Sequence, residues 1–275
     1  MVQLTEREVK QKLIIRKKKK KKYEHVLLAI KLFVPLLILG IWEFASAQGL
    51  IRATILPAPS RIFETLWLLM QTGEIFTHIS VSLWRIAQGF LIGGTLGIVI
   101  GILTGLFKPI DAATSLVIGL LRPIPNLAWV PILILWFGIG ETSKIVVIAI
   151  ASFWPVLLNV VDAIKRTDKK FLEVAKVLEK SKMVTVFQVI LPSTLPSIFV
   201  GLRSGMDLAW RSVVGAELIA ASAGIGYFMS YSREISQTDS MLASVLCIAV
   251  IGLTIDFLLR KLQSKILKWD PNFAK

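Results

Sequence analysis

Three charged side chains lie four residues apart inside one apolar segment: Arg203, Asp207 and Arg211. This spacing places them on one face of a helix, and charges inside membrane-spanning segments are costly unless they pair or serve transport. We predict that Arg203 and Asp207 form a structural pair. Arg211 and its neighbour Trp210 are then candidates for a pathway that attracts a small anion. Glu217 lies off this face near the end of the segment, where it could gate the pathway or be solvated.

A second polar group interrupts the apolar segment at about residues 112–137. Three prolines and Arg122 fall within ten residues there, which a regular helix cannot accommodate. A broken helix at membrane depth is tolerated only where protein or a water-filled cavity covers it. We therefore predict that Arg122, Pro125 and Asn126 line a translocation pathway. The alternative interpretation is a packing kink.

No residues are spaced as in a catalytic or metal site. His25 and His78 lie far apart, and neither has a cysteine at ligand spacing. The single cysteine, Cys247, excludes an intrachain disulfide. The run GIGETSK at 138–144 lacks the order of a phosphate-binding loop, and we interpret it as an external turn. We expect no metal, no cofactor and no ATPase site in this chain.

The composition indicates a membrane protein. Of the 275 residues, 55% are hydrophobic, and the mean hydropathy is +0.70, which soluble domains rarely reach. The net charge of +14 would suit nucleic acid. However, the basic residues cluster beside apolar segments, as the positive-inside rule describes. The expected partner of this charge is membrane lipid and not nucleic acid.

Six apolar segments predict an all-α membrane domain over residues 26–262. Each is near the roughly 20 residues that a bilayer core requires. A basic tail (1–25) and a C-terminal tail (263–275) flank the domain, and an amphipathic helix near 62–70 is expected at the membrane surface. An even number of spans places both termini with the basic loop 165–192 on the cytoplasmic side. The predicted spans are approximately 26–45, 86–106, 112–137, 145–164, 193–221 and 240–259.

The second predicted span carries five glycines at four-residue intervals. In lipid, such a stripe lets a neighbouring backbone approach closely. We interpret it as a packing surface and not as the lining of a pathway. The glycines are Gly89, Gly93, Gly97, Gly101 and Gly105.

The segment 167–192 is charged and amphipathic between two apolar spans. Phe171, Val174, Ala175 and Leu178 follow helical spacing. A second apolar stripe begins after Ser181 and is expected to end at Pro192. We predict a short helix, a turn and a second short helix outside the bilayer. A solvated loop that only fixes topology would not need two stripes, so we predict a docking surface for a partner protein.

The same loop resembles the signature loop of ABC-importer permeases. The resemblance rests on the motifs at 173–175 (EVA), 190–192 (ILP) and 201–203 (GLR). Residues 121–141 and 222–239 are similar to aliphatic-sulfonate and related permeases. Glu179 stands where that family usually has glycine, so the turn must form without glycine at Glu179, Lys180 or Ser181.

This resemblance implies a six-helix type I ABC-importer (MetI-like) permease fold in a bacterial inner membrane. A homodimer or paired permease would form the pore, and two cytoplasmic ABC ATPase subunits would bind ATP-Mg. A periplasmic or lipid-anchored substrate-binding protein would deliver the substrate for alternating access. The residues implied for ATPase docking are Glu173, Val174, Ala175, Leu178, Glu179, Leu191 and Pro192.

The resemblance favours an aliphatic sulfonate or taurine as substrate. Nitrate, bicarbonate and pyrimidine-precursor permeases are also similar, so these substrates stay open. An ATP-independent secondary carrier would be expected to show an inverted repeat, which the sequence does not display. A membrane enzyme would require a catalytic constellation, and none is visible.

Overall fold

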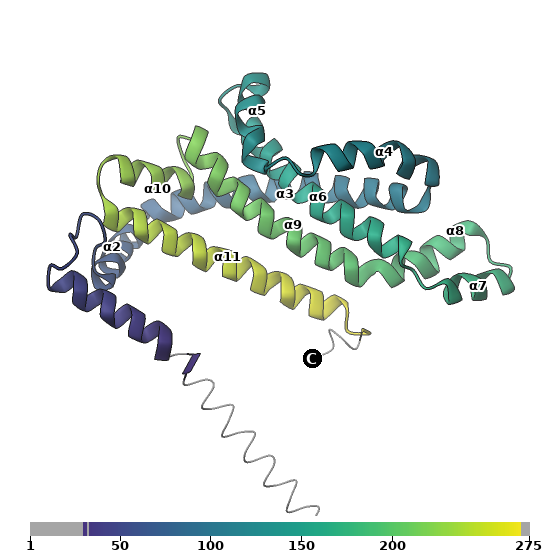
Figure 1. Ribbon diagram of the computed structural model, residues 1–275, viewed down its shortest axis with the longest axis horizontal. Helices are drawn as coiled ribbons and strands as arrows, with labels where there is room; N and C mark the ends of the chain where they lie inside the picture. Colours follow the sequence, from purple (N-terminus) through teal and green to yellow (C-terminus); the bar gives the residue numbers. More distant parts are fainter. Residues whose placement is uncertain (1–29, 32, 271–275) are drawn as a thin grey trace, which may run out of the picture. The chain divides into compact units, whose positions relative to one another are not determined.

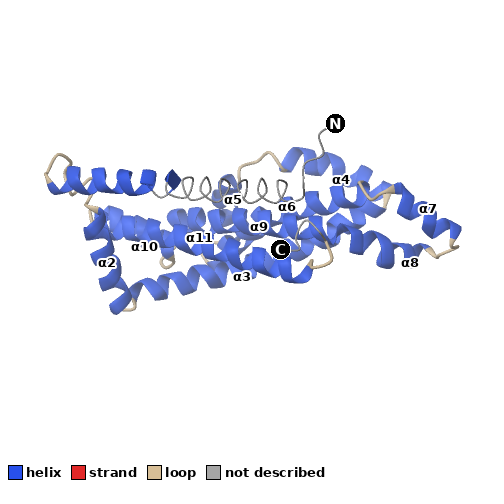
Figure 2. Cartoon of the chain, turned by 90° about the horizontal axis from the view of Figure 1, so that it is seen from below, coloured by secondary structure: helices blue, strands red, loops and turns tan. Residues whose placement is uncertain are grey.

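The computed structural model describes residues 30–31 and 33–270, and every regular element in that part of the chain is helical (Figures 1 and 2). The predicted basic tail, the start of the first span and residues 271–275 lie outside the described residues. The chain divides into two compact units, 1–64 and 65–275.

The first unit contains the apolar helix Phe33–Ala47. Near the end of this helix, the Glu43 carboxylate accepts hydrogen bonds from the backbone N–H of Ser60 at 3.0 Å and from its hydroxyl at 2.7 Å. Ser60 lies in the first turn of α2 (Pro59–Gln71). Glu43 therefore satisfies a backbone donor that a helix start leaves free. The helix predicted near residues 62–70 is confirmed.

The second unit contains four helices that are long and apolar enough to cross a membrane. They are α3 (Glu74–Leu106), α6 (Glu141–Lys165), the continuous stretch Lys182–Ala220 that includes α9 (Leu191–Ala220), and α11 (Thr238–Ile266). The helix α4 (Lys108–Leu121) and the segment Asn126–Phe137 are also apolar and meet at a bend of 84°, so together they count as a fifth span if they cross the membrane as one. The first predicted span, at about residues 26–45, is unconfirmed, because the described part of the chain contains only the shorter apolar helix Phe33–Ala47 there.

The glycine stripe packs α3 against α6, as predicted. A methyl group added at Gly97 would lie 2.9 Å from the Phe153 carbonyl oxygen, and one added at Gly101 would lie 2.8 Å from the Val160 Cβ. The backbones of α3 and α6 therefore approach more closely than any residue with a side chain would allow. On its other side, α6 packs along α9 (Figure 1), where Val156 and Ile198 share a buried core.

The predicted break after Arg122 is confirmed. The chain leaves α4 at Leu121, forms the short 3-10 helix η1 (Asn126–Ala128) and continues as α5 (Trp129–Phe137). Pro125 precedes η1 with a ψ of 134°, which is extended backbone and incompatible with a continuous helix.

The segment 167–192 forms a helical hairpin, but its second arm does not end at Pro192. The first arm is α7 (Lys169–Val177), and the second is α8 (Lys182–Thr185). A π-helical stretch, η2 (Val186–Ile190), joins α8 directly to α9. The N–H of Leu191 bonds the Val186 carbonyl, five residues back. This wider turn shifts the hydrogen-bond register just before Pro192, so that the proline, which has no N–H to donate, does not break the helix.

Candidate functional site

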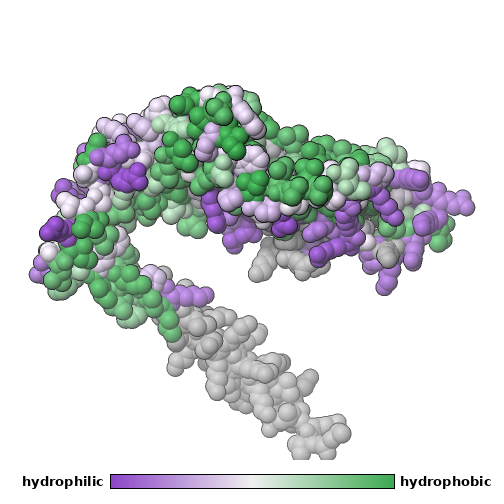
Figure 3. Space-filling model, turned by 45° about the horizontal axis from the view of Figure 1, so that its top comes forward, coloured by the Kyte–Doolittle hydropathy of each residue, from purple (hydrophilic) through white to green (hydrophobic). Residues whose placement is uncertain are grey.

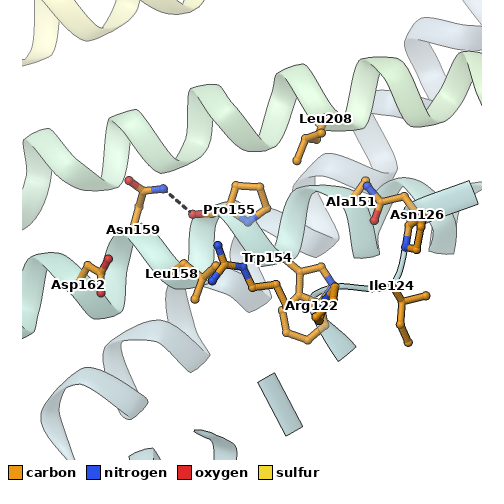
Figure 4. Close-up of a pocket in the computed structure, with 12 residues that line it drawn as sticks. Arg122, Ile124, Asn126, Ala151, Trp154, Pro155, Leu158, Asn159, Asp162 and Leu208 are labelled. Carbon is orange, nitrogen blue, oxygen red and sulfur yellow. Dashed lines mark hydrogen bonds between the residues drawn. The ribbon is translucent and has the colours of Figure 1, made fainter. Parts of the chain in front are cut away.

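The broken span opens onto a cavity of about 530 Å³ (Figure 4). Arg122, Pro125 and Asn126, all predicted to line a pathway, contribute to its wall. The remaining wall comes from one face of α6 and from Leu208 of α9. This volume lies within the roughly 300–1,000 Å³ that small-molecule sites occupy.

Two further cavities adjoin the first along α6. One, of about 550 Å³, extends between α4 and α6 and shares Arg122 and Asp162 with it. The other, of about 420 Å³, lies between the end of α6, the hairpin and the start of α9, and shares Asn159 and Asp162. Asp162 therefore lines all three cavities. Polar side chains thus follow α6 from the break to the hairpin.

The charged face of α9 does not pair as predicted. Arg203 bonds Asp256 of α11 at 2.5 Å, and Asp207 pairs with Arg211 at 2.8 Å. The predicted Arg203–Asp207 pair is wrong because Asp256 competes from the neighbouring helix, a partner that spacing within one segment cannot reveal.

Trp210 and Arg211 lie outside the cavity. The Trp210 side chain is buried, and its indole N–H donates to the Ile248 carbonyl of α11 at 3.2 Å. The indole nitrogen would lie 3.0 Å from a methyl group added at Gly252. Trp210 therefore packs α9 onto α11. Arg211 is exposed, with 71% of its side-chain surface accessible.

Glu217 is neither solvated nor near the cavity residues. Its carboxylate is fully buried and bonds the Arg85 guanidinium at 2.8 Å. It also accepts from the Ser82 hydroxyl at 2.7 Å and from the Gly226 N–H at 2.9 Å. A charge taken out of water is tolerated only when such partners satisfy it. Of the two interpretations of Glu217, solvation is therefore wrong, and a gating role stays a prediction.

Arg85 links three helices and one turn in a network that we call the Arg85 cluster. Its guanidinium bonds both oxygens of Glu141 at 2.6 and 2.7 Å, and it donates to the Ala223 carbonyl at 2.6 Å. Lys144 adds a contact to Glu141 at 3.1 Å. The cluster fixes α3, α6 and α9 to the turn that leads into α10 (Ile225–Glu234). The cluster comprises Ser82, Arg85, Glu141, Lys144, Glu217, Ala223 and Gly226.

Sequence reasoning missed this cluster. Arg85 stands at the edge of a long apolar run, where it is easily interpreted as an interfacial charge. In the structure α3 begins at Glu74, about three turns before Arg85, so the arginine lies inside the helix. Glu141 and Lys144 were assigned to an external turn, but they form the first turn of α6.

The hairpin presents an apolar surface. Phe171, Val174 and Leu178 are exposed, with 56–61% of their surface accessible, whereas Ala175 is buried. Glu173 and Glu179 are exposed beside them, and Leu191 and Pro192 are half-buried where the second arm joins α9. Hydrophilic residues surround this end of the chain, with hydrophobic ones among them (Figure 3). Exposed apolar side chains on a charged hairpin are typical of a protein interaction site.

The turn of the hairpin forms at Glu179 without glycine, as predicted. Glu179 adopts a left-handed conformation with φ of 49°. The Lys180 N–H bonds the Ala175 carbonyl, and the Glu179 N–H bonds the Lys176 carbonyl, each at 3.0 Å. This is the Schellman arrangement that closes a helix. The Ser181 hydroxyl then caps the second arm by accepting from the Val184 N–H at 3.3 Å.

The long apolar helices of the bundle are those of a polytopic membrane protein. Residues 95–268 match the family described as binding-protein-dependent transport system inner membrane component. The chain belongs to this family. It is a multi-pass inner-membrane permease subunit of an ABC importer, a system that pairs the permease with an ATPase and a substrate-binding protein.

Curated relatives match nearly the whole chain. The putative aliphatic sulfonates transport permease protein SsuC of Bacillus subtilis is 41% identical over 88% of each chain. The taurine transport system permease protein TauC of Escherichia coli is 34% identical, over 84% of this chain and 86% of its own. The bicarbonate transport system permease protein CmpB of Synechococcus elongatus is 33% identical, over 92% and 93%.

A solved structure confirms the type I fold. A chain from the crystal structure of an amino acid ABC transporter with histidines superposes with a TM-score of 0.60. It is 20% identical, and the match covers 73% of this chain and 96% of that one.

Proposed function

We propose that this chain carries a small anion, an aliphatic sulfonate or taurine, across the inner membrane by alternating access. The observation that carries the proposal is the cavity of about 530 Å³ at the broken span, which contains the Arg122 guanidinium. A planar guanidinium binds oxyanions through several parallel hydrogen bonds. The sulfonate and taurine permeases among the relatives favour the same substrate class.

The working importer would contain two permease copies and two cytoplasmic ATPase subunits. The ATPases would bind ATP-Mg, and this chain would have no enzymatic activity of its own. A periplasmic or lipid-anchored binding protein would supply the substrate from outside. Both termini and the hairpin would face the cytoplasm, because the lysines of the hairpin follow the positive-inside rule.

The hairpin would couple ATP binding to the cavity. Val174 and Leu178 expose apolar surface that an ATPase groove would cover. The second arm continues without interruption through η2 into α9. Because α9 contributes Leu208 to the cavity wall, movement of the hairpin would be transmitted along one helix to the pathway.

Bicarbonate is the second candidate substrate. The 33% identity to a bicarbonate permease over 92% of the chain supports it, and the guanidinium would bind bicarbonate as well as a sulfonate. The cavity walls include the apolar side chains Ile124, Leu158 and Leu208. These would contact the alkyl part of a sulfonate, which bicarbonate lacks, and therefore favour the sulfonate.

The proposal is tested by transport in proteoliposomes that contain the permease, its ATPase and its binding protein. We expect uptake of labelled taurine or alkanesulfonate only when ATP is present on the ATPase side. Arg122→Gln should slow this uptake on the order of tenfold, the effect of losing about 1.4 kcal/mol of binding. Uptake that persists without ATP would indicate a secondary carrier. Uptake of bicarbonate but of no sulfonate would favour the second candidate.

A further inference from the structure

Two opposite charges without partners face the same space beside the broken span. Arg122 and Asp162 line both the cavity of about 530 Å³ and the adjoining one of about 550 Å³. Among residues 30–31 and 33–270, neither charge forms an ion pair. Their neighbours Asp111 and Lys165, which line the second cavity, neutralise each other at 2.7 Å. Apart from that pair, these two cavities contain one cation, Arg122, and one anion, Asp162. The third cavity, of about 420 Å³, adds Arg166 on its side of Asp162.

The two charges reach the cavity from different elements. Arg122 follows the last residue of α4, whereas Asp162 lies near the end of α6. Figure 4 shows both side chains along the same face of α6, with Leu158 and Asn159 in the stretch between them. An occupant that meets both charges must therefore be charged at both ends, with a short apolar middle.

Polar groups along the wall support an occupant with hydrogen-bonding ends. The Asn159 amide donates to the Pro155 carbonyl at 2.8 Å, which leaves its oxygen as an acceptor. The indole N–H of Trp154 is buried on the same wall and has no acceptor in the described part of the chain. The Asn159 oxygen can therefore accept from an occupant, whereas the Trp154 nitrogen has almost no accessible surface and is not open to the cavity.

We propose that Arg122 and Asp162 form the two ends of a dipolar site that selects a zwitterionic aminoalkanesulfonate over an alkanesulfonate without an amine. This inference rests on the proposed function and narrows its substrate class. The sulfonate oxygens would accept from the guanidinium, and the ammonium would donate to the Asp162 carboxylate. An anion without an amine would meet the Asp162 charge unbalanced and be repelled by it.

The test measures binding directly, so that the binding protein does not select the ligand first. The full-length permease–ATPase complex is placed in nanodiscs, and equilibrium binding of labelled taurine is compared with that of ethanesulfonate, which has the same two carbons and no amine. Wild type should prefer taurine on the order of tenfold, the effect of one added charge contact of about 1.4 kcal/mol. Asp162→Asn should abolish the preference and keep ethanesulfonate binding, which also shows that the variant is folded. Arg122→Gln should weaken both ligands.

Glu64→Gln is the matched control, because Glu64 is an exposed carboxylate outside the cavities, and it should preserve the preference. Equal affinity of wild type for both ligands, binding of neither, or a preference that survives in Asp162→Asn would overturn the dipolar site. Uptake measured in proteoliposomes shows whether only the dipolar site is wrong or the proposed transport function as well. ATP-driven sulfonate uptake without any taurine preference would leave the proposed function intact, whereas absence of all sulfonate uptake would remove both.

Discussion

Arg85 shows how a single residue determines the local arrangement of several helices. Only 2% of its surface is accessible, and its guanidinium binds two carboxylates and a backbone carbonyl. The desolvation cost of such a buried charge is offset only while every partner is present. Loss of one charged member of the Arg85 cluster should therefore lower the stability of the protein strongly. Loss of an oppositely charged pair should lower it less.

We expect Arg85→Met to lower the free energy of unfolding by about 3–5 kcal/mol, because Glu217 would remain buried without its counter-ion. The double variant Arg85→Met/Glu217→Gln should recover part of this loss, since it removes both charges. Denaturant unfolding in detergent micelles measures both effects. Arg61→Met is the control, because Arg61 is exposed. A double variant no more stable than Arg85→Met would contradict the prediction.

Glu179 is a residue whose backbone conformation is strained. Its φ of 49° lies in the left-handed region, which costs a residue with a side chain roughly 1–2 kcal/mol relative to glycine. Glu179→Gly should stabilise the hairpin by about 0.5–1 kcal/mol. This net gain is the relief of strain minus the larger conformational entropy that glycine loses on folding. Hydrogen exchange of the Lys180 N–H, which closes the turn, should become slower. Glu179→Ala should give no such gain, and faster exchange in Glu179→Gly would exclude this explanation.

At the scale of elements, the sequence predicted what periodicity and local chemistry determine. The glycine stripe predicted the close approach of α3 and α6, and the prolines after Arg122 predicted the break. The prediction that the second hairpin arm ends at Pro192 was wrong, because a π-turn before this proline cannot be recognised from residue types alone. The partners of Arg203 and Glu217 could not be predicted, because they depend on which helices become neighbours.

The hairpin exposes apolar side chains that no other part of the described chain covers. Val174→Asp together with Leu178→Asp should abolish co-purification of the ATPase, because two charges would replace apolar contacts that are exposed by 57% and 61% in the isolated chain. The permease itself should remain folded, since neither side chain packs in its core. Ile139→Asp, a change at a position 81% exposed outside the hairpin, should keep the ATPase bound. A crosslinker at Glu173 that reaches only lipid in intact cells would disprove the docking role.

At the scale of the whole molecule, the charge distribution determines the orientation in the membrane. Lysines and arginines concentrate on the hairpin and in the last turns of α11, whereas the turn 235–237 between α10 and α11 carries none. We therefore expect opposite accessibility for these two regions. In a Cys247→Ser background, Ser236→Cys should react with an impermeant maleimide in intact cells. Lys180→Cys should react only in inverted vesicles or after permeabilisation. The reverse labelling pattern would place the hairpin outside, where no ATP-driven subunit could reach it, and would contradict both the orientation and the coupling mechanism.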